Sequence, residues 1–499
     1  MMKPRTLVHG LLAGISCMAL VSCGGSSDDD VTPATTVSVG TITGFGSVIV
    51  NGVRFNDRTA TVTINDQAAT SAQLMVGMVV EVEGSVSACP NADVALCEGT
   101  ASRIRFRNNL EGPITTINRL TNTLQVMGRD VVLDDSTLVD GATISDLSGL
   151  AVGDVVAVSG LTEQNRVRAR LVQRVGLFVN GTTPVGAYGL VGNLNAALGT
   201  CTVDGVAVRF QGLPASELPP GGLVEGQYVS VQGKGFGSGL MTADRIQLRD
   251  RISYPDASLV ELEGYVSGFV SVSNFIVDGQ RVDASAAIFR NGGANDLIDG
   301  AKLEVEGTMT AGVLVASKLI FRLEANAQIV APIQSKDASA ASVVVLGQGV
   351  ITTPQTQFID QSTTAGGQGG PVRTIGYADL ALNDRIDVRA YKNSAGELVA
   401  TRIERTEPDV LLIAKGAVDA KTPVTAFTVL GIDVATGPAT HYRDAMGNLI
   451  TDITFYGLLQ VPPQVPTVVR AQGVASATSA DAIDATRTVT TRGEVEIAQ

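Results

Sequence analysis

The sequence predicts an all-β protein, organised as a tandem array of about six small, five-stranded modules. The chain is rich in Val, Thr and Ile and contains 55 glycines, a composition that favours short strands and tight turns. A hairpin pattern recurs six times, while heptads and long apolar stripes at helical spacing are absent. A chain of 499 residues is also too long for one ordinary core, so we expect several domains.

Residues 1–22 are predicted to be a signal peptide rather than part of the fold. Lys3 and Arg5 precede an apolar run from Leu7 to Val21 that is too short to span a bilayer comfortably. The run ends in Leu20-Val21-Ser22-Cys23-Gly24, which resembles the lipobox of bacterial lipoproteins. The resemblance implies cleavage before Cys23 and acylation of that cysteine. The alternative is that Cys23 is an ordinary buried thiol.

Residues 23–37 are predicted to be a flexible acidic tether, because they open with Gly24-Gly-Ser-Ser-Asp28-Asp-Asp30. Each buried lipid methylene contributes about 0.8 kcal/mol, so two or three acyl chains on Cys23 would hold the protein durably at a membrane. Gly24 stands where Asp would resemble an inner-membrane retention signal. We therefore expect a lipid anchor in the outer membrane and a periplasmic or surface-exposed chain, and surface display is our hypothesis.

The charge balance argues against a nucleic-acid partner. Cleavage before Cys23 leaves 34 basic and 49 acidic side chains, a balance of −15. Binding to a phosphate backbone needs clustered Lys and Arg. Net charge otherwise reports mainly solubility and non-specific association.

The recurring hairpin has the pattern apolar-x-Val-x-Gly-x-x-apolar. Asn-Gly and Asp-Gly loops are preferred in two-residue hairpins because both loop residues need positive φ. Such a loop places Val50 opposite Val53 and Val48 opposite Phe55 on one apolar face. In the third copy, it places Cys201 opposite Val208 and Val203 opposite Val206. The six pattern glycines are Gly52, Gly128, Gly205, Gly279, Gly347 and Gly431.

A second pattern follows each hairpin and predicts another strand pair. It combines alternating valines with a glycine, as in Leu303-Glu-Val305-Glu-Gly307, and precedes an Ala-x-Arg/Lys-apolar strand such as Ala316-Ser-Lys318-Leu319. The second copy departs from the pattern, with Leu171 where a basic residue is expected. The sixth is interrupted by prolines, which cannot donate to a ladder and predict an edge or loop there. These prolines are Pro462, Pro463 and Pro466.

A leading strand completes about five strands in each unit of roughly 70 residues, a length that favours a small barrel over a short solenoid repeat. Strand order and length resemble the five-stranded OB-type barrel. A module of this size buries little surface when it folds alone, so we expect neighbouring modules to pack against one another. The predicted modules are 38–108, 109–176, 185–250, 258–324, 326–407 and a degenerate 409–499.

The six-fold array together with the lipobox resembles bacterial proteins that carry the domain of unknown function 5666. The resemblance covers nearly the whole chain after Cys23 and is best in the fourth copy. It implies no activity, cofactor or catalytic residue.

Three cysteines remain after Cys17, in the signal peptide, and Cys23. Cys89 and Cys97 bracket an insertion at one turn, and in an oxidising compartment they are candidates for a disulfide, the alternative being two unpaired thiols. Cys201 occupies a position that is apolar in the other copies, so we expect a buried small hydrophobe rather than a reactive thiol.

Catalytic and metal-binding patterns are sparse. His441 is the one histidine after residue 22, and we expect it in a surface loop rather than in a catalytic group. A zinc site of His and Cys and a nucleotide fingerprint are absent from the sequence. Alternating carboxylates at Glu81/Glu83 and Glu304/Glu306 are expected on the outer, solvated faces of strands, within reach of Arg103 and Lys318. Calcium binding is the alternative there.

The sequence thus predicts a non-enzymatic, lipid-anchored cell-envelope protein that acts as an extended scaffold or interaction surface, without a cofactor. Its partners are the membrane, through Cys23, and an envelope protein or glycan. The alternative is an array of ligand-binding modules for envelope glycan or divalent metal, although the 4% aromatic content and the lack of Trp weaken the glycan version. Local function is expected where copies differ: the Cys89–Cys97 insertion, the Gly-rich loop at 365–371 and the grooves between modules.

Overall fold

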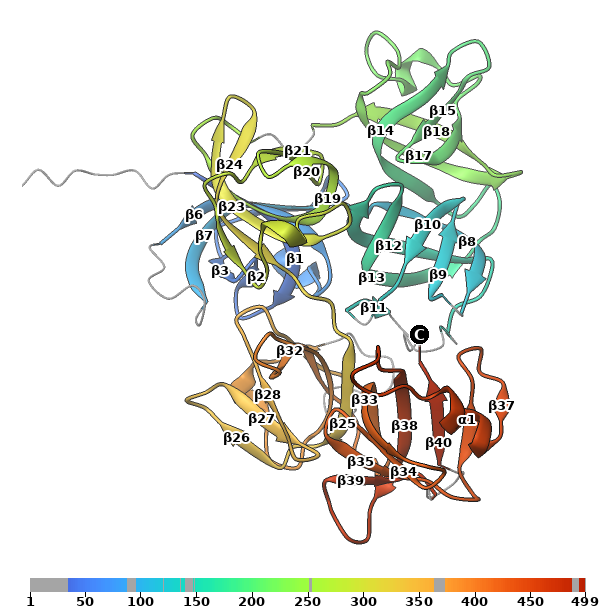
Figure 1. Cartoon of the computed structure of the whole chain (residues 1–499). Helices are drawn as coiled ribbons and strands as arrows, with labels where there is room; N and C mark the ends of the chain where they lie inside the picture. Colours follow the sequence, from blue (N-terminus) through green and yellow to red (C-terminus); the bar gives the residue numbers. More distant parts are fainter. Residues whose placement is uncertain are drawn as a thin grey trace, which may run out of the picture. The chain divides into compact units, whose positions relative to one another are not determined.

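The computed structural model describes residues 35–87, 96–119, 121–134, 136–139, 147, 149–250, 254–362, 373–486 and 493–498. Strands dominate these residues, which contain a single α-helix, α1 (Asp452–Leu458) (Figure 1). The all-β prediction is therefore confirmed. No helix within these ranges is long and apolar enough to cross a membrane.

Module 1 shows the plan that the other modules repeat. Its first three strands form a meander, β1-β2-β3, and β7 runs parallel to β3. β6 pairs antiparallel with both β7 and β1, which closes a barrel in the order β1-β2-β3-β7-β6. This is the order of an OB-type barrel. The strands are β1 (Thr36–Gly44), β2 (Val48–Val50), β3 (Val53–Asn56), β4 (Thr61–Ile64), β5 (Gln67–Ala69), β6 (Val79–Val86) and β7 (Cys97–Phe106).

Modules 2 and 3 close in the same way, with a parallel pair between the third strand and the last. Module 2 contains β8 (Leu110–Asn118), β9 (Thr123–Val126), β10 (Arg129–Val132), β11 (Leu138–Val139), β12 (Asp154–Glu163) and β13 (Arg166–Leu177). Module 3 contains β14 (Val185–Asn195), β15 (Thr200–Val203), β16 (Val206–Arg209), β17 (Tyr228–Gly237) and β18 (Leu240–Leu248).

Module 4 repeats the closure, and module 5 builds its first strand from two pieces. Module 4 contains β19 (Leu259–Ser271), β20 (Asn274–Val277), β21 (Gln280–Asp283), β22 (Ile288–Arg290), β23 (Lys302–Thr310) and β24 (Val313–Phe321). Module 5 contains β25 (Ala327–Pro332), β26 (Ser335–Asp337), β27 (Ser342–Val345), β28 (Gln348–Ile351), β29 (Gln357–Asp360), β30 (Arg373–Thr374), β31 (Arg385–Lys392) and β32 (Leu398–Arg405).

Module 6 departs most from the plan, because two short strands share the place of the last one. Its strands are β33 (Leu412–Thr422), β34 (Ala426–Val429), β35 (Ile432–Ala435), β36 (His441–Arg443), β37 (Leu449–Ile450), β38 (Val468–Ala475), β39 (Ala482–Asp484) and β40 (Glu494–Ile497). The predicted proline interruption lies between α1 and β38, outside any strand. The helix was not predicted, since seven residues are too few to show a helical period. Thr451 caps it by accepting from the backbone N of Thr454 at 3.2 Å, and buried Phe455 joins the module core.

The six hairpins have the predicted register. Val50 pairs with Val53 and Val48 with Phe55, and Cys201 pairs with Val208. Both loop residues have positive φ in every copy, as at Asn51 (50°) and Gly52 (76°). The sequence pattern therefore encodes a type I′ turn, the two-residue loop whose twist matches that of the flanking strands.

The glycine that ends the Val-x-Val-x-Gly pattern marks a β-bulge. The ladder between β23 and β24 shifts register between Glu306 and Gly307. A Cβ on Gly307 would collide with the carbonyl oxygen of Val315 on the facing strand. Modules 1, 2 and 3 have the same bulge with Gly84, Gly160 and Gly233. The recurring glycine thus follows from a close approach of two backbones.

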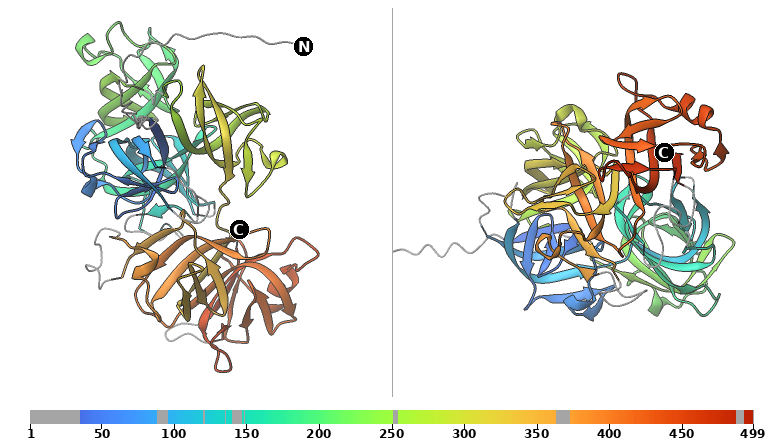
Figure 2. Two further views of the ribbon diagram at one scale, coloured as in Figure 1. Left: turned by 90° about the vertical axis from the view of Figure 1, so that its left-hand side faces the viewer. Right: turned by 90° about the horizontal axis from the view of Figure 1, so that it is seen from below.

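First strands join the modules in three pairs. β1 pairs in parallel with β19, and β8 with β14 and β25 with β33 are antiparallel pairs. The three sheets therefore combine modules 1 and 4, 2 and 3, and 5 and 6. Modules 5 and 6, coloured orange to red, lie side by side in both views (Figures 1 and 2). Modules 1 and 4 are thus hydrogen-bonded to each other although they are far apart in sequence.

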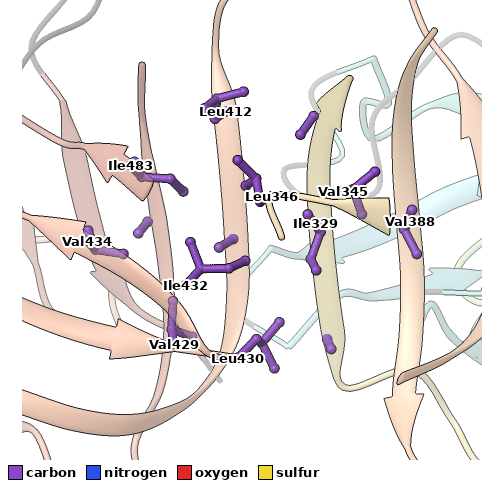
Figure 3. Close-up of a cluster of buried hydrophobic side chains, with 14 of the residues drawn as sticks. Ile329, Val345, Leu346, Val388, Leu412, Val429, Leu430, Ile432, Val434 and Ile483 are labelled. Atoms are coloured by element: carbon purple, nitrogen blue, oxygen red, sulfur yellow. The ribbon is translucent and has the colours of Figure 1, made fainter. Parts of the chain in front are cut away.

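The joint between modules 5 and 6 has a continuous apolar core (Figure 3). Leu346 and Leu430 take the first loop position of their hairpins, where the first, third and fourth copies have Asn or Asp. Both have φ in the left-handed region, at 46° and 54°, and both are almost completely buried. Burial at the joint therefore outweighs the ordinary preference of this backbone position for Asn or Gly.

Leu171 explains why the second copy departs from its pattern. Together with Leu138 and Ile359 it completes the core of module 1, although these three residues belong to modules 2 and 5. A Cβ on Gly77 would lie 2.8 Å from the carbonyl oxygen of Arg170. Module 1 thus accepts an apolar side chain from module 2 where a basic residue would leave a charge in its core.

Candidate functional site

Two of the predicted site residues lie outside the described residues. They are Cys23, the lipidation candidate, and Cys89, one of the two disulfide candidates. The Gly-rich loop at 365–371 also lies outside the described residues. Cys97 opens β7. Its disulfide with Cys89 and the acylation of Cys23 remain predictions.

Cys201 is buried in a hydrophobic core, and His441 is half-buried in a strand. Cys201 is 3% exposed in the core of modules 2 and 3, and burial raises the pKa of its thiol to about 11. A thiol held protonated in this way is a poor nucleophile, which agrees with the prediction of a buried hydrophobe. His441 lies in β36 rather than in a loop, half-buried, and its backbone N donates to Gly493 O at 2.8 Å.

The alternating carboxylates were expected on a solvated face, and this prediction is wrong for Glu81 and Glu304. Their exposed fractions are 6% and 1%. The predicted cross-strand pairs do form, at 3.1 Å for Arg103–Glu83 and 2.7 Å for Lys318–Glu306. The face away from each barrel core is buried where another module covers it, and a single repeat gives no sign of that contact.

A chain of buried polar groups links modules 2 and 4. Arg170, in β13, is 2% exposed. Its Nη1 lies 3.2 Å from Asp134 Oδ2, and its Nη2 donates to Tyr265 Oη in β19 at 2.6 Å. The Tyr265 hydroxyl donates to Glu324 at 3.2 Å, and Arg168 lies 3.2 Å from the same carboxylate. Each buried charge has an opposite partner, as burial requires.

The β1–β19 joint contains a second buried group. The backbone N of Thr41 donates to Glu263 Oε2 at 2.7 Å, and Lys302 Nζ lies 2.7 Å from Glu263 Oε1. Although burial opposes its ionisation, Lys302 and Arg170 hold the pKa of Glu263 well below its usual range. Glu261, two residues earlier, differs: burial raises its pKa to about 7.

A pocket of about 450 Å³ opens where modules 1 to 4 meet. β6 and β7 supply Glu81 and Arg105, and β12 supplies Leu161. β14 and β17 supply Tyr188 and Tyr228. The hairpin turns of modules 3 and 4 contribute their loop residues, and Tyr254 lies just before module 4. The pocket therefore exists only when the modules are assembled, and it lies in one of the predicted inter-module grooves.

Two polar atoms in this wall are buried without a hydrogen-bond partner among the described residues: Glu81 Oε2 and Tyr188 Oη. Glu81 Oε2 lies 3.4 Å from Arg105 Nε, an ion pair without hydrogen-bond geometry. Burial raises the pKa of Glu81, and Arg105 opposes the rise. Burial likewise raises the pKa of Tyr188 well above its usual range, and the nearby carboxylate of Asp66 adds to the rise. Buried polar atoms normally have partners, so Glu81 Oε2 above all marks a place for a ligand or water.

The second arginine of the pocket already has protein partners. Arg107 Nη2 lies 2.7 Å from Asp66 Oδ1, and its Nη1 donates to Asp250 O at 3.0 Å. Its guanidinium carbon lies 5.7 Å from the centre of the Tyr188 ring, a cation–π distance. Arg249 of module 3 also binds Asp66, at 2.6 Å. These contacts fix one wall of the pocket by joining modules 1 and 3.

A second, larger pocket of about 890 Å³ lies beside the first and shares Tyr188 with it. Its polar side chains include Glu111, Lys234 and Arg245. Arg245 lies 2.6 Å from Glu217, which also lines this pocket. Burial raises the pKa of Glu111, and a hydrogen bond with Asn108 opposes the rise.

The pocket lining is suited to holding a small polar ligand. The described residues hold no group of three or more His, Cys, Asp or Glu side chains that could bind a metal ion. The pocket offers rings, amides, hydroxyls and carboxylates, the groups that orient small polar ligands. Few signals in the sequence indicate this site, because the tyrosines of module 3 meet Glu81 and Arg105 only through the contact between modules.

Comparison with known proteins finds segments that match one family of unknown function. Four segments, residues 38–88, 111–173, 263–319 and 331–404, match the family described as Domain of unknown function (DUF5666). They lie in modules 1, 2, 4 and 5. A search of curated proteins finds no match. The chain is thus a tandem-repeat β protein with four DUF5666 segments, as the repeat pattern predicted.

Proposed function

We propose that this chain is a non-enzymatic, lipid-anchored protein of the cell envelope whose joined barrels form a scaffold and interaction surface. The observation that carries the proposal is the use of buried charged side chains at the joints between modules. Arg170, for example, contacts Asp134 and Tyr265 in two different modules. Such contacts stabilise the relative positions of barrels, which is what a platform for partners requires.

Buried arginines also join other pairs of modules. Arg129 of module 2 is 3% exposed and lies 3.3 Å from Asp204 of module 3. Arg402 of module 5 is 2% exposed and donates to the carbonyl oxygen of Thr137 in module 2 at 3.1 Å. A buried guanidinium is costly without partners, so these residues tie the modules together rather than serve as exposed charges.

The anchor is tested by Cys23→Ala. We expect the full chain to incorporate radiolabelled palmitate and to fractionate with the outer membrane, and the variant to lose both properties, because one thiol carries the lipid. Cys201→Ala is the matched control, since this thiol is buried. Labelling that survives in Cys23→Ala would contradict the lipid anchor.

The scaffold role is tested by crosslinking on whole cells. A photoreactive residue placed at exposed Val270 (73% exposed) or Val465 (84% exposed) is expected to capture the same envelope partner repeatedly. A photoreactive residue at buried Val345 is the control and should capture only the chain itself. Chains that crosslink to no envelope component at any exposed position would overturn the scaffold proposal.

A further inference from the structure

We propose that the 450 Å³ pocket where modules 1 to 4 meet binds a neutral saccharide of one or two rings. The proposal deepens the interaction role proposed above by naming a ligand class. It rests on that role only in placing the sugar in the envelope. The pocket itself depends on the assembled modules and not on the lipid at Cys23.

The size of the pocket suits such a ligand. Its volume of about 450 Å³ lies within the roughly 300–1,000 Å³ of small-molecule sites. Its lining comes from strands of four modules and from two hairpin turns, so it is concave because barrels meet there. A flat sheet face would not enclose a ligand on several sides.

Tyrosines gather in this pocket. Tyr188, Tyr228 and Tyr254 line it, although the whole chain has only eight tyrosines and no tryptophan. Aromatic rings with a polar tip combine an apolar face with a hydrogen-bonding group, which matches a sugar ring with its apolar face and hydroxyl edge. The low aromatic content of the whole chain argues against glycan binding in general. It does not apply to this pocket, where three tyrosines lie together.

The polar atoms match hydroxyl groups. Glu81 Oε2 needs a donor, while Tyr188 Oη can donate or accept, and both are buried without a hydrogen-bond partner within the described ranges. A sugar hydroxyl both donates and accepts, so one or two hydroxyls can satisfy both atoms. Glu81 is more than nine-tenths buried, which makes the missing hydrogen bond costly.

The charges favour a neutral ligand. Three carboxylates line the pocket, those of Glu81, Asp204 and Asp278. Its two guanidinium groups, Arg105 and Arg107, are already paired with carboxylates of module 1. The carboxylate of a sugar acid would therefore find both of these guanidinium groups engaged in ion pairs with the protein. Burial of an anion without a cationic partner is costly, which disfavours glucuronate relative to an uncharged sugar.

Titration calorimetry tests the proposal on the full chain, purified in a detergent without a sugar headgroup. Maltose and cellobiose are the neutral probes, and glucuronate is the charged one. We expect saturable binding of one neutral disaccharide per chain with a Kd of about 1 mM or tighter. Glucuronate should bind at least tenfold more weakly. Absence of saturable binding by both neutral disaccharides, or tighter binding of glucuronate, would overturn the proposal.

Two variants locate the site. Tyr228→Ala should weaken disaccharide binding roughly tenfold by removing a ring. Glu81→Gln preserves the side-chain volume and should also weaken binding, because an acceptor oxygen is replaced by a donor. Tyr391→Ala, at a half-buried tyrosine of module 5 outside the pocket, is the matched control. Thermal melts verify that each variant is folded.

The results separate this proposal from the anchoring role. Unchanged affinity in folded Tyr228→Ala and Glu81→Gln would show that any sugar binds elsewhere and would overturn the pocket assignment. Failure of sugar binding would leave palmitate labelling and membrane fractionation at Cys23 intact. Loss of fractionation in Cys23→Ala, with sugar affinity unchanged, would fit both proposals.

Discussion

At the scale of the residue, Glu261 makes the β1–β19 joint sensitive to pH. It lies opposite Ser38 on β1 and Glu306 on β23. Burial is the main reason that its pKa rises to about 7, and Glu306 adds to the rise, whereas Ser38 and Lys318 oppose it. Ionisation of this carboxyl therefore works against the contact between modules 1 and 4.

The pH dependence follows from that pKa. A carboxyl whose folded pKa is raised from 4.5 to about 7 binds its proton more tightly in the folded state. Its stabilising contribution is complete below about pH 4.5 and is lost as the pH rises through about 7. Glu261→Gln, which cannot ionise, should exceed the unsubstituted chain in unfolding free energy by about 3 kcal/mol at pH 8.

Chemical denaturation at pH 4.5 and pH 8 measures this effect. At pH 4.5 the two proteins should differ little, because the carboxyl is largely protonated in the folded chain. An equal difference at both pH values would show that Glu261 does not titrate in the joint.

At the scale of the element, the β-bulge explains the glycine that ends the Val-x-Val-x-Gly pattern, which is Gly307 of β23 in module 4. Gly307→Ala should lower the unfolding free energy by about 2 kcal/mol, because the new Cβ collides with the Val315 carbonyl and the ladder must shift. Gly349→Ala is the matched control, a strand glycine whose Cβ would meet open space. It should stabilise by about 0.5 kcal/mol. Thermal unfolding of both variants measures the contrast, and equal effects would contradict the bulge explanation.

The strand elements were predictable because their signals are local. Val50 and Gly52 specify a hairpin through alternation and positive φ, and the structure has the predicted register. The partners of the first strands were not predictable, since a single repeat does not show which other module covers it. Leu171 and Leu430 did carry a signal, an apolar residue where the pattern expects a polar one, and both lie at contacts with another module.

The candidate site was harder to predict for the same reason. Grooves between modules were expected to matter, but the pocket combines Tyr188 and Tyr228 of module 3 with Glu81 of module 1, more than 100 residues earlier in the sequence. Alternation places Glu81 on the outside of its barrel, and only the neighbouring modules make that outside a buried wall.

At the scale of the whole molecule, buried charges should make the modules unfold together. Arg170→Met removes the partner of Asp134 and Tyr265 in a buried setting, so it should destabilise the chain by about 3 kcal/mol. Hydrogen exchange should then rise in β13 and in β19, which belong to different modules. Arg245→Met, which breaks an exposed pair with Glu217, is the control and should change little. A change confined to β13 would contradict coupling between modules 2 and 4.

The pairing of β1 with both β6 and β19 has a mechanical consequence. β1 begins at Thr36, two residues inside the predicted tether, so force on an anchored chain enters the fold through this strand. A pull along β1 loads its hydrogen bonds to β6 and β19 in shear, and the bonds must break together rather than one by one. Extraction of β1 would remove a strand from module 1 and a neighbour from module 4 at once. For a chain anchored as proposed, the lifetime under load is therefore set by one nine-residue strand.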